Sequence, residues 1–286
     1  MLALAAATHL CAKEAWRIVV AHYREQLDWL PSLLEADGRL HPGGRRPSVY
    51  VYHKGGDHAP TRGRGVSSGI STYVSETNAE YFRRFNGTLK WITLENIGRE
   101  VETFTRHLFS HYDDLAPMTA FLQGNPEHSD RRYNGTVLRE LKQAILYTHG
   151  RTRQAEAGGA DSWLEGRRVQ RFGETPRCQL LGAPMVPTDG DGCPNHCGIA
   201  IMSTCSKLAT RLPVKERLSC HEPFPFVAGG MFCLSRAAVH AYKRPFYLAM
   251  QDMLYAERCF KKRAPLYPYV YERLWGRLFN CSWSRW

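Results

Sequence analysis

The sequence predicts an α/β fold in which a mostly parallel central sheet is flanked by helices. The clearest indication is an apolar, strand-like run at 89–94, followed by an amphipathic helical pattern at 101–112 and a second apolar run at 118–122. Strand-like and helical patterns alternate through the first half of the chain, which favours parallel strands joined by helices. The composition is also typical of a folded domain, because 43% of the 286 residues are hydrophobic and 23% are charged.

The first segments of the chain supply two further strands and two helices. A buried strand is expected at 17–22, and leucines at helical spacing predict a helix over 27–34. Alternating valines and tyrosines predict a second strand at 47–53, which ends at Lys54 and a loop rich in Gly and Arg. A polar helix at 76–85 then continues the alternation.

The second half of the chain is less regular. After a helix at 137–146, the segment at about 151–221 is rich in Gly, Pro, Arg and Cys with little periodicity, which indicates an irregular, Cys-rich insertion. A strand at 226–234 contains paired glycines, and Ser235 is expected to cap the helix that follows. The remaining expected elements are a leader or first helix at 1–15, a helix at 245–257 and a helix carrying Val270, Leu274 and Leu278, so that 16–286 forms a single α/β domain.

The net charge points to an anionic partner. A formal charge of +11 and a pI near 9.3 suit nucleic acid, an acidic membrane surface or a small phosphorylated ligand. The arginine pairs are spread along the chain, which makes nucleic acid an unlikely partner, and no apolar run approaches the roughly 18 residues of a membrane span. Three Asn-x-Ser/Thr sequons favour the secretory pathway or Golgi lumen, at Asn86, Asn134 and Asn280.

Polar residues just past the predicted strands form the candidate site. In α/β folds such residues line the ligand crevice, because helix amino termini and unpaired backbone groups converge there. The candidates are Tyr23, Glu25, Lys54, Asn96, Gly98, Arg99, Glu100, Gln123 and His128.

Several ordered blocks of the chain carry a resemblance to a known family. The blocks are Ala-His-Tyr-Arg-Glu at 21–25, Asn-x-Gly-Arg-Glu at 96–100, Phe-Leu-Gln-Gly at 121–124, Ala-Gly-Gly-Met-Phe-x-Leu-Ser-Arg at 228–236 and Tyr-Glu-Arg-Leu-Trp at 271–275. They resemble a eukaryotic family of uncharacterised domains that is itself similar to nucleotide-sugar glycosyltransferases of the A-type fold. The likeness covers about 16–147 and 225–279. It implies a glycosyltransferase-A-like architecture and transfer of a sugar from a nucleotide-diphosphate donor to a hydroxyl acceptor.

The resemblance also raises the question of a metal. Enzymes of that fold usually neutralise the leaving diphosphate with a divalent metal on an Asp-x-Asp placed just after a central strand, where this chain has Gln123 and Gly124. The literal match, Asp189-Gly-Asp191, lies in a Pro/Gly loop and is typical of a turn. We therefore expect metal-free chemistry without a permanently bound cofactor. The cleft should be cationic, with pyrophosphate held by Lys54, Arg99 and Arg236.

Donor binding is expected near the first strand and the helix at 101–112. Tyr23 would stack on a nucleobase and Glu25 would bind a ribose hydroxyl, unless Tyr23 belongs to the core and Glu25 is a surface cap. Arg99 follows Gly98 at a helix amino terminus, where the helix dipole favours an anion. The alternative is that Asn96 and Gly98 only cap this helix.

Glu272 is the predicted base that accepts the proton of the acceptor hydroxyl. The neighbouring Trp275 gives it a partly apolar setting, which makes a carboxylate a better proton acceptor. The alternative is an ordinary ion pair on the helix with Arg273 or Arg277.

Other residues are assigned to the sugar and the acceptor. Glu100, Gln123 and His128 would bind hydroxyl groups, and Gly229 and Gly230 would let the acceptor approach closely.

The cysteines leave several alternatives open. Nine cysteines cannot all pair with one another, and most lie late in the chain. The spacing of Cys193 and Cys197 allows a structural zinc, a disulfide or buried thiols. Two rival functions also stay open, namely a non-catalytic relative that binds a glycan or phosphate, and a basic nucleic-acid-binding module.

Overall fold

A computed structural model describes the parts of the chain on which the fold rests. The described residues are 16–40, 47–54, 73–84, 89–126, 137–143, 145, 178–180, 210, 230–256, 266–279 and 281. The elements among them, in chain order, are β1 (Trp16–His22), α2 (Trp29–Leu40), β2 (Ser48–His53), α4 (Glu76–Arg84), β3 (Leu89–Thr93), α5 (Arg99–Ser110), β4 (Met118–Gln123), β5 (Cys178–Leu180), β6 (Phe232–Ser235), α8 (Arg236–His240), α9 (Arg244–Ala256) and α10 (Leu266–Leu278).

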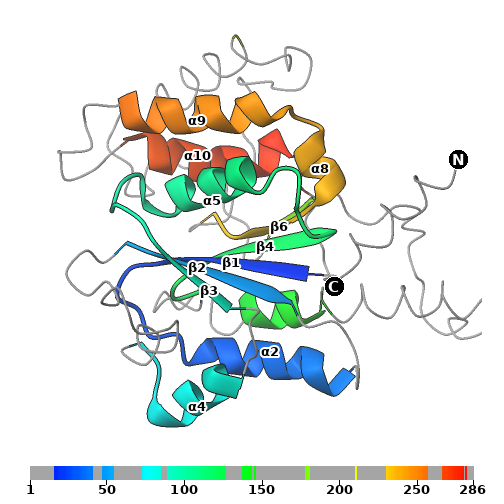
Figure 1. Ribbon diagram of the computed structural model, residues 1–286. Helices are drawn as coiled ribbons and strands as arrows, with labels where there is room; N and C mark the ends of the chain where they lie inside the picture. Colours follow the sequence, from blue (N-terminus) through cyan, green and yellow to red (C-terminus); the bar gives the residue numbers. More distant parts are fainter. Residues whose placement is uncertain are drawn as a thin grey trace, which may run out of the picture.

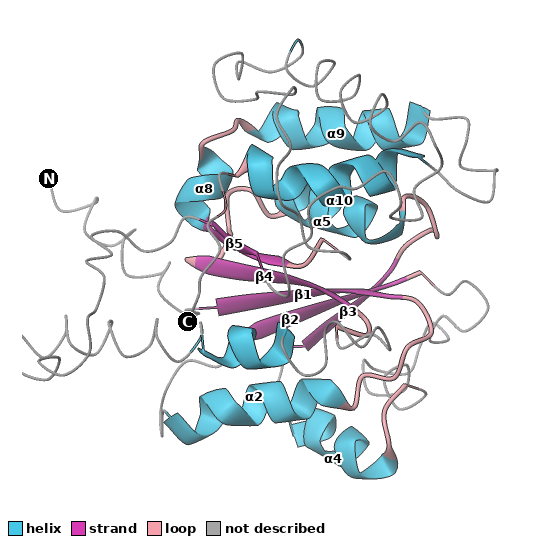
Figure 2. Cartoon of the chain, turned by 180° about the vertical axis from the view of Figure 1, so that it is seen from behind, coloured by secondary structure: helices cyan, strands magenta, loops and turns pink. Residues whose placement is uncertain are grey.

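The strands form one mixed, mostly parallel sheet in the order β3-β2-β1-β4-β6-β5. β1 pairs in parallel with both β2 and β4, and β2 pairs in parallel with β3. β6 runs antiparallel to β4, and β5 runs antiparallel to β6. Helices α5, α9 and α10 cover one face of the sheet, and α2 and α4 lie over the other (Figure 1, and from behind in Figure 2). The predicted α/β class is thereby confirmed.

The hydrophobic core explains why the strands predicted from apolar runs form the centre of the sheet. Val19 and Val20 of β1 and Leu122 of β4 are fully buried, as expected for central parallel strands that are covered on both faces. On the α5 side, the ring of Phe104 packs edge-on against Phe121 with centroids 5.2 Å apart. Burial of each such side chain contributes roughly 1.5–3 kcal/mol before conformational entropy is subtracted.

The boundaries of α5 and α9 agree with the sequence prediction to within two residues, whereas α2 ends at Leu40 rather than at 34 and β6 begins only at Phe232. α5 begins at Arg99, directly after Gly98, and α9 begins at Arg244 with Pro245 in its first turn, a position that suits proline. The hydroxyl of Ser235 accepts a hydrogen bond from the backbone N–H of Ala238 at 3.1 Å, so the predicted cap of α8 is confirmed.

The segment predicted as an insertion contributes to the sheet. β5 lies within 151–221 and pairs with β6, although a segment of three residues shows no periodicity in the sequence. Apart from 178–180 and residue 210, the insertion lies outside the described residues, as do the leader at 1–15 and the sequon asparagines Asn86, Asn134 and Asn280. In the described part of the chain, no helix is both long and apolar enough to cross a membrane.

Candidate functional site

The carboxyl ends of the parallel strands meet at one edge of the sheet. In the register of the strands, Ala21 lies beside Gln123 of β4 and His22 lies beside His53 of β2. A cavity of about 330 Å³ opens at this edge. The described residues that line it are Ala21, His22, Tyr23, Glu25, Lys54, Asn96, Arg99, Glu100 and Gln123.

The cavity brings together residues that lie far apart in the sequence. Seven of the predicted site residues line it, and they come from the segments after β1, β2 and β3 and from the last residue of β4. This is the convergence expected when polar residues follow the carboxyl ends of neighbouring parallel strands. The seven are Tyr23, Glu25, Lys54, Asn96, Arg99, Glu100 and Gln123.

The loop after β1 is held by its own glutamate. One carboxylate oxygen of Glu25 accepts hydrogen bonds from the backbone N–H groups of Tyr23, at 2.7 Å, and Arg24, at 3.1 Å. The same oxygen lies so close to Gly124 that a Cβ there would meet it at 2.5 Å. The side chain of Tyr23 is 40% exposed, so this ring is not part of the core; it lines the cavity, and the guanidinium of Arg24 lies over one of its faces.

Lys54 lines the cavity, but its ammonium group already has partners in the protein. Its Nζ donates to the carbonyl of Ile97 at 2.7 Å, donates to the carbonyl of Arg99, and lies 3.0 Å from the carboxylate of Glu102. Two of the three N–H donors of the ammonium group are thus used by backbone carbonyls, and its charge is paired with Glu102. Burial lowers the pKa of Lys54, and the charge of Glu102 opposes that shift. These contacts do not support the predicted phosphate contact of Lys54, because they show Lys54 holding the loop before α5.

The start of α5 has an unusual backbone conformation. Gly98 has a φ of 62° and Arg99 a φ of 53°, and Arg99 is the only described residue other than glycine with a positive φ. A left-handed conformation costs a residue with a Cβ roughly 1–2 kcal/mol. Gly98 occupies the N-cap position without any side-chain cap hydrogen bond, so Asn96 does not cap the helix. The Nε of Arg99 lies 3.7 Å from a carboxylate oxygen of Glu100, and the Arg99 side chain is 45% exposed.

The charges of the described residues that line the cavity are balanced. Lys54 and Arg99 carry positive charges, Glu25 and Glu100 carry negative charges, and Glu102 directly contacts Lys54. Arg99 is the described cationic lining residue whose side chain reaches solvent. The expectation of a cationic cleft is therefore not supported by the described lining residues, whose charges offset one another.

A buried histidine pair forms part of the site and was missed in the sequence. Nδ1 of His22 and Nδ1 of His53 are 2.9 Å apart, and Nε2 of His22 lies 2.9 Å from the carbonyl oxygen of Glu25. A carbonyl can only accept, so Nε2 of His22 carries the proton and Nδ1 of His22 accepts one from His53. Burial lowers the pKa of His22 to about 4. The available signal was that both strands end in histidine.

Gly230 and Glu272 lie close to each other, but neither is among the described residues that line the cavity. Because β6 is antiparallel to β4, Gly230 lies just before β6 at the same edge as Gln123. A Cβ on Gly230 would lie 3.1 Å from Trp275 and 3.4 Å from the Cγ of Glu272. This glycine, with a φ of 57°, thus allows α10 to approach the sheet, and neither residue is among the described lining of the cavity. Their predicted roles as acceptor contact and catalytic base are not supported by these positions.

Arg236 lies at the opposite edge of the sheet. Its backbone N–H donates to the carbonyl of Pro117 at 2.9 Å, and Ser235 is the register partner of Met118 at the start of β4. This position does not support the expected contact between Arg236 and a phosphate bound in the cavity. The sequence pattern of β6 predicted a strand but could not reveal that it runs antiparallel to β4.

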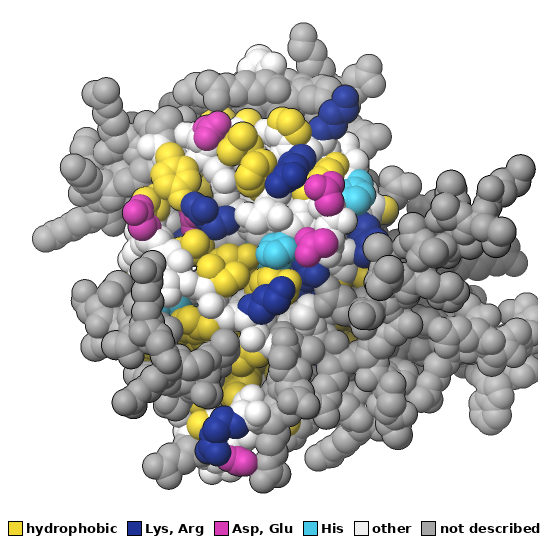
Figure 3. Space-filling view, in the orientation of Figure 1, with side chains coloured by type: hydrophobic (Ala, Val, Ile, Leu, Met, Phe, Trp, Pro, Cys, Tyr) yellow, Lys and Arg dark blue, Asp and Glu magenta, His cyan; other side chains and the backbone are white. Residues whose placement is uncertain are grey.

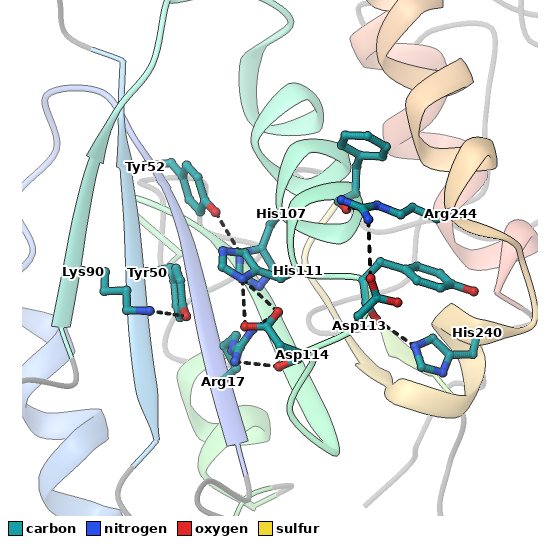
Figure 4. A network of polar contacts seen from close by, with 12 residues as sticks. Arg17, Tyr50, Tyr52, Lys90, His107, His111, Asp113, Asp114, His240 and Arg244 are labelled. Carbon is teal, nitrogen blue, oxygen red and sulfur yellow. Dashed lines mark hydrogen bonds and ion pairs between the residues drawn. The ribbon is translucent and has the colours of Figure 1, made fainter. Parts of the chain in front are cut away.

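A second polar cluster lies between α5 and the sheet (Figure 4). The hydroxyl of Tyr52 shares a 2.9 Å hydrogen bond with Nδ1 of His107, which is fully buried. Nδ1 of His111 lies 3.0 Å from the carboxylate of Asp114. Burial lowers the pKa of His107 well below its usual range and also lowers that of His111. No residue of this cluster belongs to the described lining of the cavity, and its hydrogen bond between Tyr52 and His107 joins β2 to α5.

The remaining predicted residues lie outside the described part of the chain. They are His128, Gly229, Asp189, Asp191, Cys193 and Cys197. Within the described part, no group of three or more His, Cys, Asp or Glu side chains is placed to hold a metal ion.

The cavity and its sheet define an α/β protein with a polar site at the carboxyl edge of its parallel strands. Comparison with models of protein families, with curated proteins and with solved structures found no match for this chain. Its function is therefore argued from the cavity and from the chemistry of the residues around it.

Proposed function

We propose that the cavity binds a nucleotide-linked sugar and that the protein transfers this sugar to a hydroxyl acceptor, as in glycosyltransferases of the A-type fold. The observation that carries the proposal is the convergence of loops from β1, β2, β3 and β4 around one cavity. At about 330 Å³, the cavity lies at the lower end of the range of small-molecule sites. This volume suits a nucleoside or monosaccharide unit.

The lining residues suit the parts of such a donor. The half-exposed ring of Tyr23 offers a surface on which a base or sugar can stack. Glu25 and Gln123 supply oxygen and amide groups that pair with ribose or sugar hydroxyls. Arg99, at the amino terminus of α5, supplies a guanidinium for the phosphate.

Sugar transfer also requires a base, and we assign this role to Glu100. The acceptor oxygen forms a bond to the anomeric carbon as the bond from that carbon to the diphosphate oxygen breaks. The electron pair leaves with the diphosphate, whose charge Arg99 offsets, and the acceptor proton passes to the carboxylate of Glu100. Glu100 lines the cavity, whereas Glu25 already accepts two backbone N–H groups and Glu272 lies outside the lining.

The charge balance favours a second candidate, a protein that binds a glycan without catalysis. Two carboxylates, two amides and an exposed tyrosine form a suitable lining for a neutral ligand rich in hydroxyl groups. A nucleic-acid-binding function receives less support. On the face seen in Figure 3, Lys and Arg side chains of the described residues are interspersed with Asp and Glu.

The experiment that tests the proposal is a donor panel on the purified protein. UDP-glucose, UDP-N-acetylglucosamine and GDP-mannose are each added with EDTA or with Mn²⁺, and thermal stabilisation and donor hydrolysis are measured. We expect at least one donor to stabilise the protein and to be hydrolysed, with hydrolysis lost in Glu100→Gln but not in the surface variant Lys243→Met. Binding of free monosaccharides without donor binding or turnover would favour the second candidate. No response to any of these ligands would refute both.

A further inference from the structure

Arg99 adopts a backbone conformation that its own Cβ disfavours, and a buried ion pair contacts the backbone at this point. We propose that Glu102, acting through Lys54, is a positioning residue that fixes Arg99 for contact with the phosphate of the ligand. This inference rests on the function proposed for the cavity. It assigns to Glu102 a role that its buried position, away from the cavity lining, does not suggest by itself.

Lys54 connects the ion pair to the backbone of the loop. Its Nζ contacts the carbonyl oxygens of Ile97 and Arg99 and the carboxylate of Glu102, the last at 3.0 Å. The two carbonyls flank Gly98, so the ammonium group fixes the peptide planes on both sides of the left-handed pair. Lys54 is only 4% exposed and Glu102 only 1%, so water does not compete strongly for these contacts.

Glu102 is in turn held from its other side. Its second carboxylate oxygen accepts from Nε of Arg106 at 2.5 Å and from the hydroxyl of Tyr255 at 3.0 Å. Tyr255 lies on α9, so the carboxylate is anchored to a neighbouring helix as well as to its own. Tyr255 of α9 thus contacts Glu102, Glu102 contacts Lys54, and Lys54 lines the cavity.

Loss of the Lys54 ammonium group should allow the left-handed backbone of Arg99 to relax. Without the ammonium group, the carbonyls of Ile97 and Arg99 lose their partner, and Arg99 can relax to the negative φ that residues with a Cβ prefer. Such a relaxation rotates the peptide that starts α5 and moves the guanidinium relative to the cavity. The affinity for a phosphate-bearing ligand then falls, while contacts to a nucleoside alone are retained.

The test uses Glu102→Gln and Lys54→Met, with Lys243→Met as a control that removes an exposed lysine. Amide hydrogen exchange is measured over 96–102, where the N–H groups of Ile97 and Glu102 have backbone partners. Calorimetry gives the Kd values of uridine diphosphate and uridine. We expect faster exchange in this segment and about tenfold weaker binding of uridine diphosphate in both variants, with the Kd of uridine changed by less than about twofold. The control should match the wild-type protein in both measurements.

The outcomes separate this inference from the function on which it rests. Unchanged exchange over 96–102 in Glu102→Gln, which differs least in shape, overturns the inference even if Lys54→Met fails to fold. An equal loss of affinity for uridine diphosphate and uridine also overturns it, because the pair would then support the cavity as a whole. If the wild-type protein binds neither ligand and no donor of the panel stabilises it, the proposed function and the phosphate role of Arg99 fail together. Hydrogen exchange still reports in that case whether the ion pair holds the backbone.

Discussion

The buried histidine of the cavity should make the folded state sensitive to mild acid, and replacement of His22 by glutamine should reduce this sensitivity. The pKa of His22 is lowered to about 4 in the folded protein because the ring is buried, whereas an unfolded histidine has a pKa near 6.5. Between these values the unfolded chain binds a proton that the folded protein does not. The free energy of unfolding therefore keeps its full value with respect to His22 above pH 6.5, and it decreases as the pH falls from 6.5 towards 4.

The difference between the two pKa values sets the size of the effect. At about 1.4 kcal/mol for each pH unit, the interval from 6.5 to about 4 corresponds to roughly 3 kcal/mol of unfolding free energy. His22 is only 1% exposed, so solvent screening does not reduce this figure greatly. The lowered pKa values of His107 and His111 act in the same direction, so the wild-type protein should lose more than this amount.

The assay compares urea unfolding of the wild-type protein and His22→Gln at several pH values from 4 to 7. Glutamine can still donate to the carbonyl of Glu25 but cannot take up a proton, so the variant should lose roughly 3 kcal/mol less than the wild type over this range. His240→Gln, which changes an exposed histidine of α8, is the matched control and should follow the wild-type curve. Parallel curves for His22→Gln and the wild type would refute the reasoning.

Three glycine and tyrosine substitutions test other parts of the structure. In Gly98→Ala, the φ of 62° and a Cβ 3.0 Å from that of Glu102 should lower the free energy of unfolding by about 1–2 kcal/mol, measured by urea titration; an unchanged value would contradict the left-handed conformation. In Gly124→Ala, the new Cβ would meet the carboxylate of Glu25 at 2.5 Å, so uridine affinity measured by calorimetry should fall about tenfold, whereas an unaltered Kd would place the ligand away from this loop. In Tyr23→Ala, loss of a stacking surface should weaken uridine binding by about 1 kcal/mol with little change in thermal stability, because the ring is 40% exposed; a large drop in Tm would show instead that the ring is structural.

Hydrophobic periodicity was sufficient to predict most of the fold. The runs that became β1, β2, β3 and β4 are apolar or alternating over several residues, and each is followed by a helix of clear period, so the parallel part of the sheet was predictable. β5 was not predictable, because three residues carry no period. The antiparallel direction of β6 could not be predicted either, because the alternation of a strand is the same in both chain directions.

The positions of the site residues were more predictable than their roles. Strand ends determine where a side chain lies in a parallel sheet, and this placed Tyr23, Arg99 and Gln123 around one cavity. The partners of Lys54 depend on how α5 packs on the sheet, and Glu102 is one of two acidic residues in the first turn of that helix. No local pattern distinguishes the glutamate that is buried against a lysine from one that faces solvent.

The charges of the described lining residues say more about which ligand can bind than the net charge of the whole chain does. Because Glu102 offsets Lys54 and Glu100 lies beside Arg99, a diphosphate meets little net positive charge from the described lining residues, despite the chain's formal charge of +11. A diphosphate donor must then rely on the Arg99 guanidinium and the amino terminus of α5, or arrive with a divalent cation of its own. The first case predicts donor affinity that is insensitive to EDTA and falls on loss of Arg99, whereas the second predicts affinity that depends on Mn²⁺. A neutral glycan depends on neither, so the response of binding to Mn²⁺ and to Arg99→Ala together distinguishes a transferase from a protein that only binds sugar.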